Sequence, residues 1–130
     1  IEIKRLRALP GVHFVGDPND LDFQSYLSGL NILINYREEY NGETSLSVIE
    51  SLRHGVAPIV RDIGWYSELP DDTVIKVSSH KKVIDAAYSL VMDNAKLKQM
   101  GKAAQSVTER DFSHESYAFA LYEAVVELES

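Results

Sequence analysis

Continuous apolar runs separated by helical patterns are the feature that most restricts the fold of this 130-residue chain. The runs LNILINY and GVAPIV are the clearest, and they are continuous rather than alternating. Such runs are typical of strands buried on both faces, as in a parallel sheet. Four runs are predicted as strands: Val12–Val15, Leu30–Tyr36, Val56–Val60 and Thr73–Val77.

Helical patterns lie between these runs and after them. One ends at Gly55, a residue type common just beyond a helix end, and several place apolar residues at i, i+3, i+4 and i+7. The predicted helices are Asp20–Ser28, Ser45–His54, Lys81–Asp93, Leu97–Glu109 and Ser113–Leu128, with Ile1–Leu9 as the tail of another. This alternation predicts an α/β fold, in which a parallel sheet is flanked by helices.

Length and charge limit the classes of partner. The chain is long enough for one domain, 1–130, with its own core. A net charge of −7 argues against nucleic acid or anionic membrane as the main partner.

No apolar run approaches the roughly 20 residues of a membrane span, and no signal peptide is visible. The absence of cysteine fits a reducing compartment, and the start at Ile1 leads us to expect a piece of a longer protein.

Ligands on open parallel sheets bind beyond the carboxyl ends of the strands. Three segments meet that condition in the predicted fold: Gly16–Asp20, Tyr36–Ser45 and Arg61–Glu68.

The sequence Gly-Glu-Thr-Ser from Gly42 to Ser45 opens a predicted helix. Thr44 or Ser45 can serve as N-cap, which leaves unpaired amides at Leu46–Val48. Such a helix start is a natural phosphate site, but plain capping, with Glu43 favouring the positive helix end, explains it equally well. Arg37 follows the preceding strand and could hold a phosphate or pair with a nearby glutamate.

Glu50 lies within the same predicted helix. Two faces are expected, an apolar buried one and a polar one, made respectively of Leu46, Val48, Ile49 and Leu52 and of Ser47, Glu50, Ser51 and His54. The polar face is either solvated or lines a cleft. In a cleft, the carboxylate could accept hydrogen bonds from two vicinal hydroxyls, as acidic residues do with ribose.

Gly64 follows the third predicted strand, where it either forms a turn or lets the backbone approach a ligand. The four histidines show no metal-ligand spacing, and the sequence has neither G-x-G-x-x-G nor G-x-x-x-x-G-K-[ST]. No metal site is therefore expected.

Taken together, the stretch GVHFVGDPNDLDFQSYLSGLNILINYR…GETSLSVIESLRHGVAPIVRDIGWYSELPDD resembles the carboxyl-terminal Rossmann-like domain of group 1 (family 4-like) retaining glycosyltransferases of GT-B architecture. The family has V-x-F-x-G, an acid-rich loop, a helix ending in E-[AS]-L-x-x-G-x-P and a strand followed by G-x-x-E-[LIV]. This sequence has VHFVG, an acid-rich loop, ESLRHGVAP and GWYSEL, and the last two have one more residue after the glycine than the family pattern. The resemblance covers about Val12 to Asp72.

The resemblance implies roles for individual residues. Glu50 matches the acid that binds the ribose hydroxyls, and Thr44, Ser45 and Leu46 match the amides that meet the donor pyrophosphate. The family spacing is E-x7-E, which puts Gly42 where the first acid is expected. Glu43 gives E-x6-E and is the candidate for the acid that contacts the donor sugar. Gly64 matches the first glycine of a G-G turn whose second is Trp65 here.

The resemblance also implies an activity. The parent would be a glycosyltransferase of the hexosyltransferase type that moves a sugar from a nucleotide-diphosphate sugar to an acceptor hydroxyl with retention, without a metal or other cofactor. This chain would lack the first βαβ unit and the amino-terminal domain that binds an acceptor glycan or lipid-linked glycan. We therefore expect the fragment to be inactive alone and able to self-associate, in a protein that is cytoplasmic and at most peripheral to the inner membrane face.

Two alternatives stay open at this point. A GT-B sugar-nucleotide epimerase would also bind a nucleotide diphosphate at this domain. A non-catalytic α/β interaction module, such as a receiver-like domain, would have acids at the end of its first strand and a lysine on a late strand.

Overall fold

The computed structural model describes residues 2–129 and has a three-stranded parallel sheet. The strands β1 (Ile32–Asn35), β2 (Ala57–Arg61) and β3 (Ile75–Val77) lie side by side in chain order. Ile34 pairs with Ile59, which in turn pairs with Ile75. The parallel sheet expected from the continuous apolar runs is therefore confirmed, although each strand is shorter than its run or shifted by one residue.

Helices flank the sheet, and they agree closely with the helical patterns of the sequence. They are α1 (Glu2–Arg7), α2 (Asp20–Gly29), α3 (Leu46–Arg53), α4 (Trp65–Glu68), α5 (His80–Met92), α6 (Asn94–Asp111) and α7 (His114–Glu129). None of these helices is both long and apolar enough to cross a membrane.

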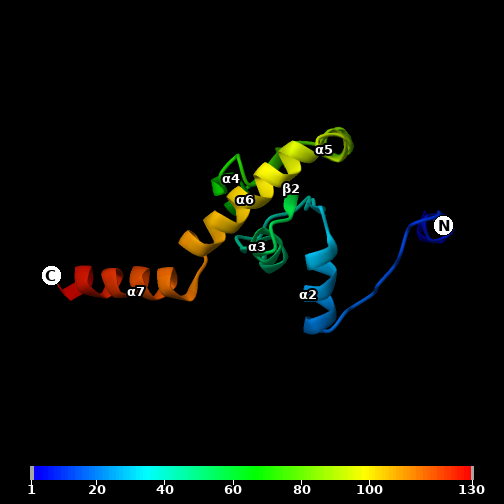
Figure 1. Cartoon of the computed structure of the whole chain (residues 1–130). Helices are drawn as coiled ribbons and strands as arrows, with labels where there is room; N and C mark the ends of the chain where they lie inside the picture. Colours follow the sequence, from blue (N-terminus) through cyan, green and yellow to red (C-terminus); the bar gives the residue numbers. More distant parts are fainter. Residues whose placement is uncertain (1, 130) are drawn as a thin grey trace.

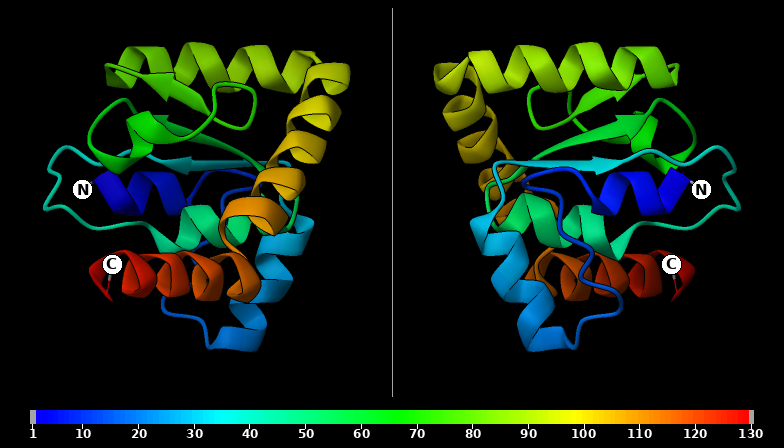
Figure 2. Two further views of the ribbon diagram at one scale, coloured as in Figure 1. Left: turned by 90° about the vertical axis from the view of Figure 1, so that its left-hand side faces the viewer. Right: turned by 90° about the vertical axis from the view of Figure 1, so that its right-hand side faces the viewer.

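Strand β2 is buried on both faces and divides the core in two. Ile59 packs in a cluster with Leu90 of α5, whereas the next residue, Val60, packs in a cluster with Val48 of α3 and with Tyr66. Figure 2 shows the resulting layers, with α5 on one side of the strands and α3 on the other. This burial explains why the β2 sequence is apolar without alternation.

Helix α6 contributes to both clusters, with Met100 in one and Ala104 in the other. Where α6 passes the end of α3, Gly101 lies so close to Gly55 that a Cβ on Gly101 would be 2.4 Å from the Gly55 carbonyl oxygen. Gly55 itself has φ +71°, a conformation that glycine adopts readily. The two glycines therefore allow α3 and α6 to approach closely.

The strand predicted at Val12–Val15 is not formed. These residues have no regular secondary structure, and Val12, Phe14 and Val15 are exposed. The segment lies between Gly11 and Gly16, both at positive φ, and no strand lies beside it to accept its backbone hydrogen bonds. The prediction was wrong because an apolar run forms a strand only where a neighbour pairs with it.

Helix α1 lies at the end of this extended segment, apart from the sheet (Figure 1). It occupies most of the range predicted as a helix tail, of which Ile1 lies outside the described residues.

Candidate functional site

The loop between β1 and α3 carries most of the residues singled out in the sequence. It leaves the carboxyl end of β1, where open parallel sheets bind ligands. Arg61, at the end of β2, donates a hydrogen bond to the carbonyl of Glu38 and ties the loop to the sheet. Gly16–Asp20, by contrast, does not follow a strand, so the condition that made it a candidate does not hold.

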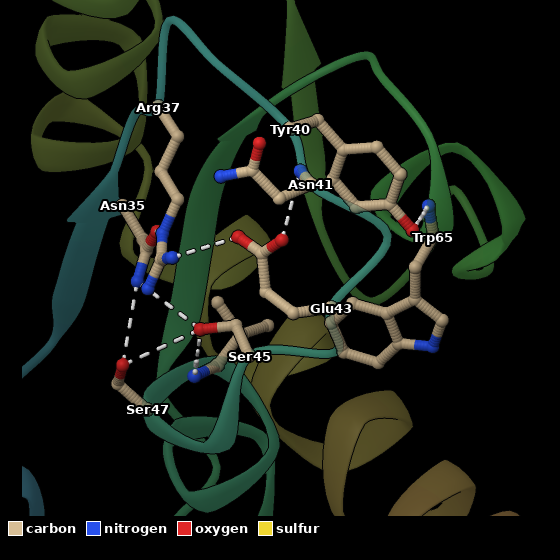
Figure 3. Close-up of polar contacts among 9 residues, drawn as sticks. Asn35, Arg37, Tyr40, Asn41, Glu43, Ser45, Ser47 and Trp65 are labelled. Carbon is tan, nitrogen blue, oxygen red and sulfur yellow. Dashed lines mark hydrogen bonds and ion pairs between the residues drawn. The ribbon is translucent and has the colours of Figure 1, made fainter.

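Glu43 is held by groups of its own loop (Figure 3). Its Oε1 accepts from Arg37 Nη1 at 2.9 Å, and its Oε2 accepts from the backbone N–H of Asn41 at 2.9 Å. The pKa of Glu43 lies below its ordinary value, chiefly because its own backbone N–H and that of Asn41 donate to the carboxylate, and further because of the Arg37 charge. The loop therefore presents a carboxylate and a guanidinium that are paired and both accessible.

Helix α3 begins with a capped turn beside this pair. The N-cap is Ser45, which is buried, and its Oγ accepts from the backbone N–H of Val48 at 3.4 Å. The amides of Leu46 and Ser47 have no hydrogen-bond acceptor among residues 2–129. The capping role expected at Thr44 or Ser45 thus belongs to Ser45, while Thr44 is exposed.

Asn35, the last residue of β1, links the strand to the start of α3 (Figure 3). Its Nδ2 lies 3.4 Å from the hydroxyls of both Ser45 and Ser47, and its Oδ1 lies 3.4 Å from Arg37 Nε. Sequence reasoning missed Asn35, although a polar residue at the carboxyl end of an apolar run satisfies the same strand-end rule that selected Arg37.

The burial of α3 differs from the expected faces. Val48 and Leu52 are buried as predicted, but Glu50 and Ser51 are buried with them, and Leu46 is 68% exposed. The prediction treated all apolar residues as one face. In the structure α3 packs against the sheet, α2 and α6, which together cover more of its circumference than a single apolar stripe.

Glu50 is 9% exposed and is held from two sides. Gln24 Nε2, from α2, donates to Glu50 Oε2 at 3.1 Å, and Arg53 Nη1 donates to Glu50 Oε1 at 2.9 Å. Gln24 Oε1 in turn lies 2.6 Å from His54 Nε2. Nothing in the sequence signals Gln24, because it is 26 residues from its partner.

Gly64 has φ +52° and lies beneath the ring of Tyr40. A Cβ at this position would be 2.1 Å from a ring carbon of Tyr40, whose hydroxyl accepts from the backbone N–H of Trp65 at 3.0 Å. The close approach expected at Gly64 is therefore present, but Tyr40 of the same chain makes it.

The structure thus brings Arg37, Glu43, Ser45 and Leu46 together beyond the carboxyl end of β1. Gly42, at φ +85°, and Thr44 form the exposed part of the same loop. Within residues 2–129, no group of three or more His, Asp or Glu side chains could hold a metal ion.

Comparison with known proteins finds a likeness among solved structures. No family model matches the sequence, and a search of curated proteins finds no match. A crystal structure of the C-terminal domain of a glycosyl transferase group 1 family protein (LpcC) from Francisella tularensis aligns with a TM-score of 0.62 and 17% identity. The alignment covers 79% of this chain and 53% of that domain structure.

The chain has the fold of that domain. At 17% identity the likeness concerns the arrangement of strands and helices, and the chain spans about half the length of the structure it matches. The fold class predicted from the sequence, a Rossmann-like parallel sheet flanked by helices, is confirmed.

Proposed function

We propose that this chain is the donor-binding part of a glycosyltransferase. The observation that carries the proposal is the first turn of α3. The free amides of Leu46 and Ser47 lie at the carboxyl end of a parallel strand, beside Arg37, in the fold of a glycosyl transferase domain. Free amides at the positive end of a helix, together with a cation that can form two hydrogen bonds, are suited to hold a diphosphate.

The proposed reaction transfers a sugar, of the hexosyl type, from a nucleotide-diphosphate sugar to an acceptor hydroxyl with retention at the anomeric carbon. The diphosphate would bind at Leu46 and Ser47, with Gly42, Thr44 and Ser45 shaping the loop around it. Arg37 is 43% exposed and would exchange part of its pairing with Glu43 for a phosphate oxygen. The helix start and the guanidinium would stabilise the leaving diphosphate without a metal.

Two acids have separate proposed roles. Glu43 would meet the donor sugar, because its carboxylate is ionised and lies beside the diphosphate position. Glu50 would accept hydrogen bonds from the ribose hydroxyls. Gln24 and Arg53 each donate a hydrogen bond to one oxygen of the Glu50 carboxylate. Each oxygen has a second lone pair, which could accept a hydrogen bond from a ribose hydroxyl. Gly64 would act indirectly, because the absence of a side chain there leaves room for the ring of Tyr40.

The proposal extends to a parent protein. The parent would contain a first βαβ unit and an amino-terminal domain for an acceptor glycan or lipid-linked glycan, and it would work in the cytoplasm, peripheral to the inner membrane face. The fragment alone would bind the donor but not transfer its sugar, and it would be prone to self-association through the unpaired edge of β1.

Calorimetry of this chain with UDP, GDP and ADP tests the proposal. We expect weak binding selective for one base. Glu50→Ala should weaken it by roughly 1–3 kcal/mol, the scale of hydrogen bonds to a charged group. Because Glu50 is buried, its variant could also unfold, so Arg37→Met is measured beside it, with the exposed Arg5→Met of α1 as the matched control.

Two results would contradict the proposal. One is the absence of any nucleotide binding by a folded chain. The other is binding that Arg37→Met and Arg5→Met reduce to the same extent.

A further inference from the structure

Residues 3–18 form an arm that includes most of α1 and the extended segment after it. The arm carries α1 to the opposite end of the molecule from α7 (Figure 1). Among the described residues, no hydrogen bond or ion pair joins the arm to residues 19–129. Its one ring contact, the guanidinium of Arg7 over Phe14 at 5.0 Å, is internal. The arm is therefore available to a partner.

One face of α1 is both apolar and basic. Ile3, Leu6 and Arg7 share it at i, i+3 and i+4, and both apolar side chains are exposed. Lys4 borders this face, whereas Arg5 points to the opposite side of the helix. In a chain of net charge −7, α1 is thus a local cationic element with apolar side chains that its own domain leaves uncovered.

The outer face of α7 is both apolar and acidic. Phe119, Tyr122 and Val126 share it at i, i+3 and i+7, and they are 62%, 67% and 45% exposed. Glu115 lies four residues before Phe119 and Glu123 four residues after it, so both acids belong to the same face. The residues of α7 that line a cavity with α3 lie on another side of the helix.

These two faces are complementary in charge and in apolar character. Two α7 helices facing each other would bring glutamates together without a cation, since α7 has no lysine or arginine. The face of α7 from Glu115 to Val126 is about 17 Å long, and α1 is about 9 Å long. The extended part of the arm, with the exposed Leu9 and Val12, is long enough to cover the remainder.

We propose that α1 of one copy of this chain packs against the outer face of α7 of a second copy. Because α1 and α7 lie at opposite ends of the molecule, two copies placed antiparallel make the contact twice, and association stops at a two-fold dimer. Donor binding plays no part in this contact, so the inference is independent of the proposed function. It also uses a surface different from the edge of β1.

Sedimentation velocity over a series of chain concentrations measures the association. We expect a monomer–dimer equilibrium that shifts toward monomer at high salt, because salt screens ion pairs across an exposed contact. Pairing along β1 would depend on backbone hydrogen bonds and would respond little to salt.

Charge reversal supplies the decisive comparison. Arg7→Glu should weaken the dimer roughly tenfold, because attraction becomes repulsion in both copies of the contact. Arg5→Glu is the matched control, since it changes the net charge equally on the opposite side of α1. Glu123→Arg should also weaken the dimer, and the combination of Arg7→Glu and Glu123→Arg in one chain should restore it.

Three outcomes would overturn the inference. One is a chain that stays monomeric at every concentration. Another is a dimer that Arg7→Glu and Arg5→Glu weaken to the same extent, and the third is a combined variant that stays as weak as its parents. In the last two cases the association uses another surface, such as the edge of β1.

Discussion

Gln24 donates a hydrogen bond to Glu50 across 3.1 Å and so joins α2 to α3. The carboxylate can only accept, so the amide nitrogen of Gln24 must face it, and the amide oxygen must face His54. His54 Nε2, 2.6 Å away, must therefore carry a proton. Gln24 thus helps Arg53 to orient the Glu50 carboxylate, and it determines that Nε2 of His54 carries a proton.

Replacing Gln24 should uncouple these groups. We expect Gln24→Leu to lower the free energy of unfolding by roughly 1–3 kcal/mol, because a nearly buried carboxylate loses a donor. In ¹⁵N NMR the Nε2–H form of His54 should give way to a mixture of tautomers. Gln99→Leu, an exposed glutamine of α6, is the control. A His54 spectrum that does not change in Gln24→Leu would refute the coupling.

Gly64 and Gly42 offer a matched pair of substitutions. Both have positive φ, but a Cβ would meet the Tyr40 ring only at Gly64, and nothing lies within 4 Å at Gly42. Gly42→Ala should cost about 1 kcal/mol from backbone strain alone. Gly64→Ala should cost several times more and should free the Tyr40 hydroxyl from Trp65. Equal melting temperatures of the two variants would show that Tyr40 does not restrict this position.

Tyr66 carries a buried hydroxyl that finds no hydrogen-bond partner within residues 2–129. An unsatisfied buried donor costs free energy, so Tyr66→Phe should stabilise the chain, by about 1 kcal/mol in chemical denaturation. Val60→Ala removes buried apolar atoms from the same cluster and should act in the opposite direction. A destabilised Tyr66→Phe would mean that the hydroxyl has a bound water as partner.

Glu43 should titrate at a lower pH than an ordinary glutamate. Its pKa lies below 4.5 in the folded chain, so its contacts contribute stability above about pH 4.5 and lose it as the pH falls through the lowered pKa. Carboxyl ¹³C NMR measures this titration directly. Arg37→Met should raise the pKa only part of the way back, because the backbone N–H groups are the larger cause. A full return to the ordinary value would assign the whole shift to Arg37.

The sequence predicts the sheet and most helices well, because continuous apolar runs and helical periodicity are local signals. Val12–Val15 fails because strand formation depends on a neighbouring strand that local composition does not reveal. The residues of the site also fall into two groups, those that local sequence signals identify and those that only the fold brings together. Ser45 and Arg37 follow from strand ends and caps, whereas the contacts Gln24–Glu50 and Tyr40–Gly64 join residues that are more than 20 positions apart.

Phe112, at the corner between α6 and α7, is in edge-on contact with Trp65, with ring centroids 6.1 Å apart. Trp65 directly follows Gly64, the N-cap of α4, and Phe112 is the C-cap of α6. An aromatic contact therefore joins the turn after β2 to the corner from which α7 leaves. A substitution that removes the Trp65 ring would therefore be expected to loosen the packing of the α6–α7 corner as well as that of the turn after β2.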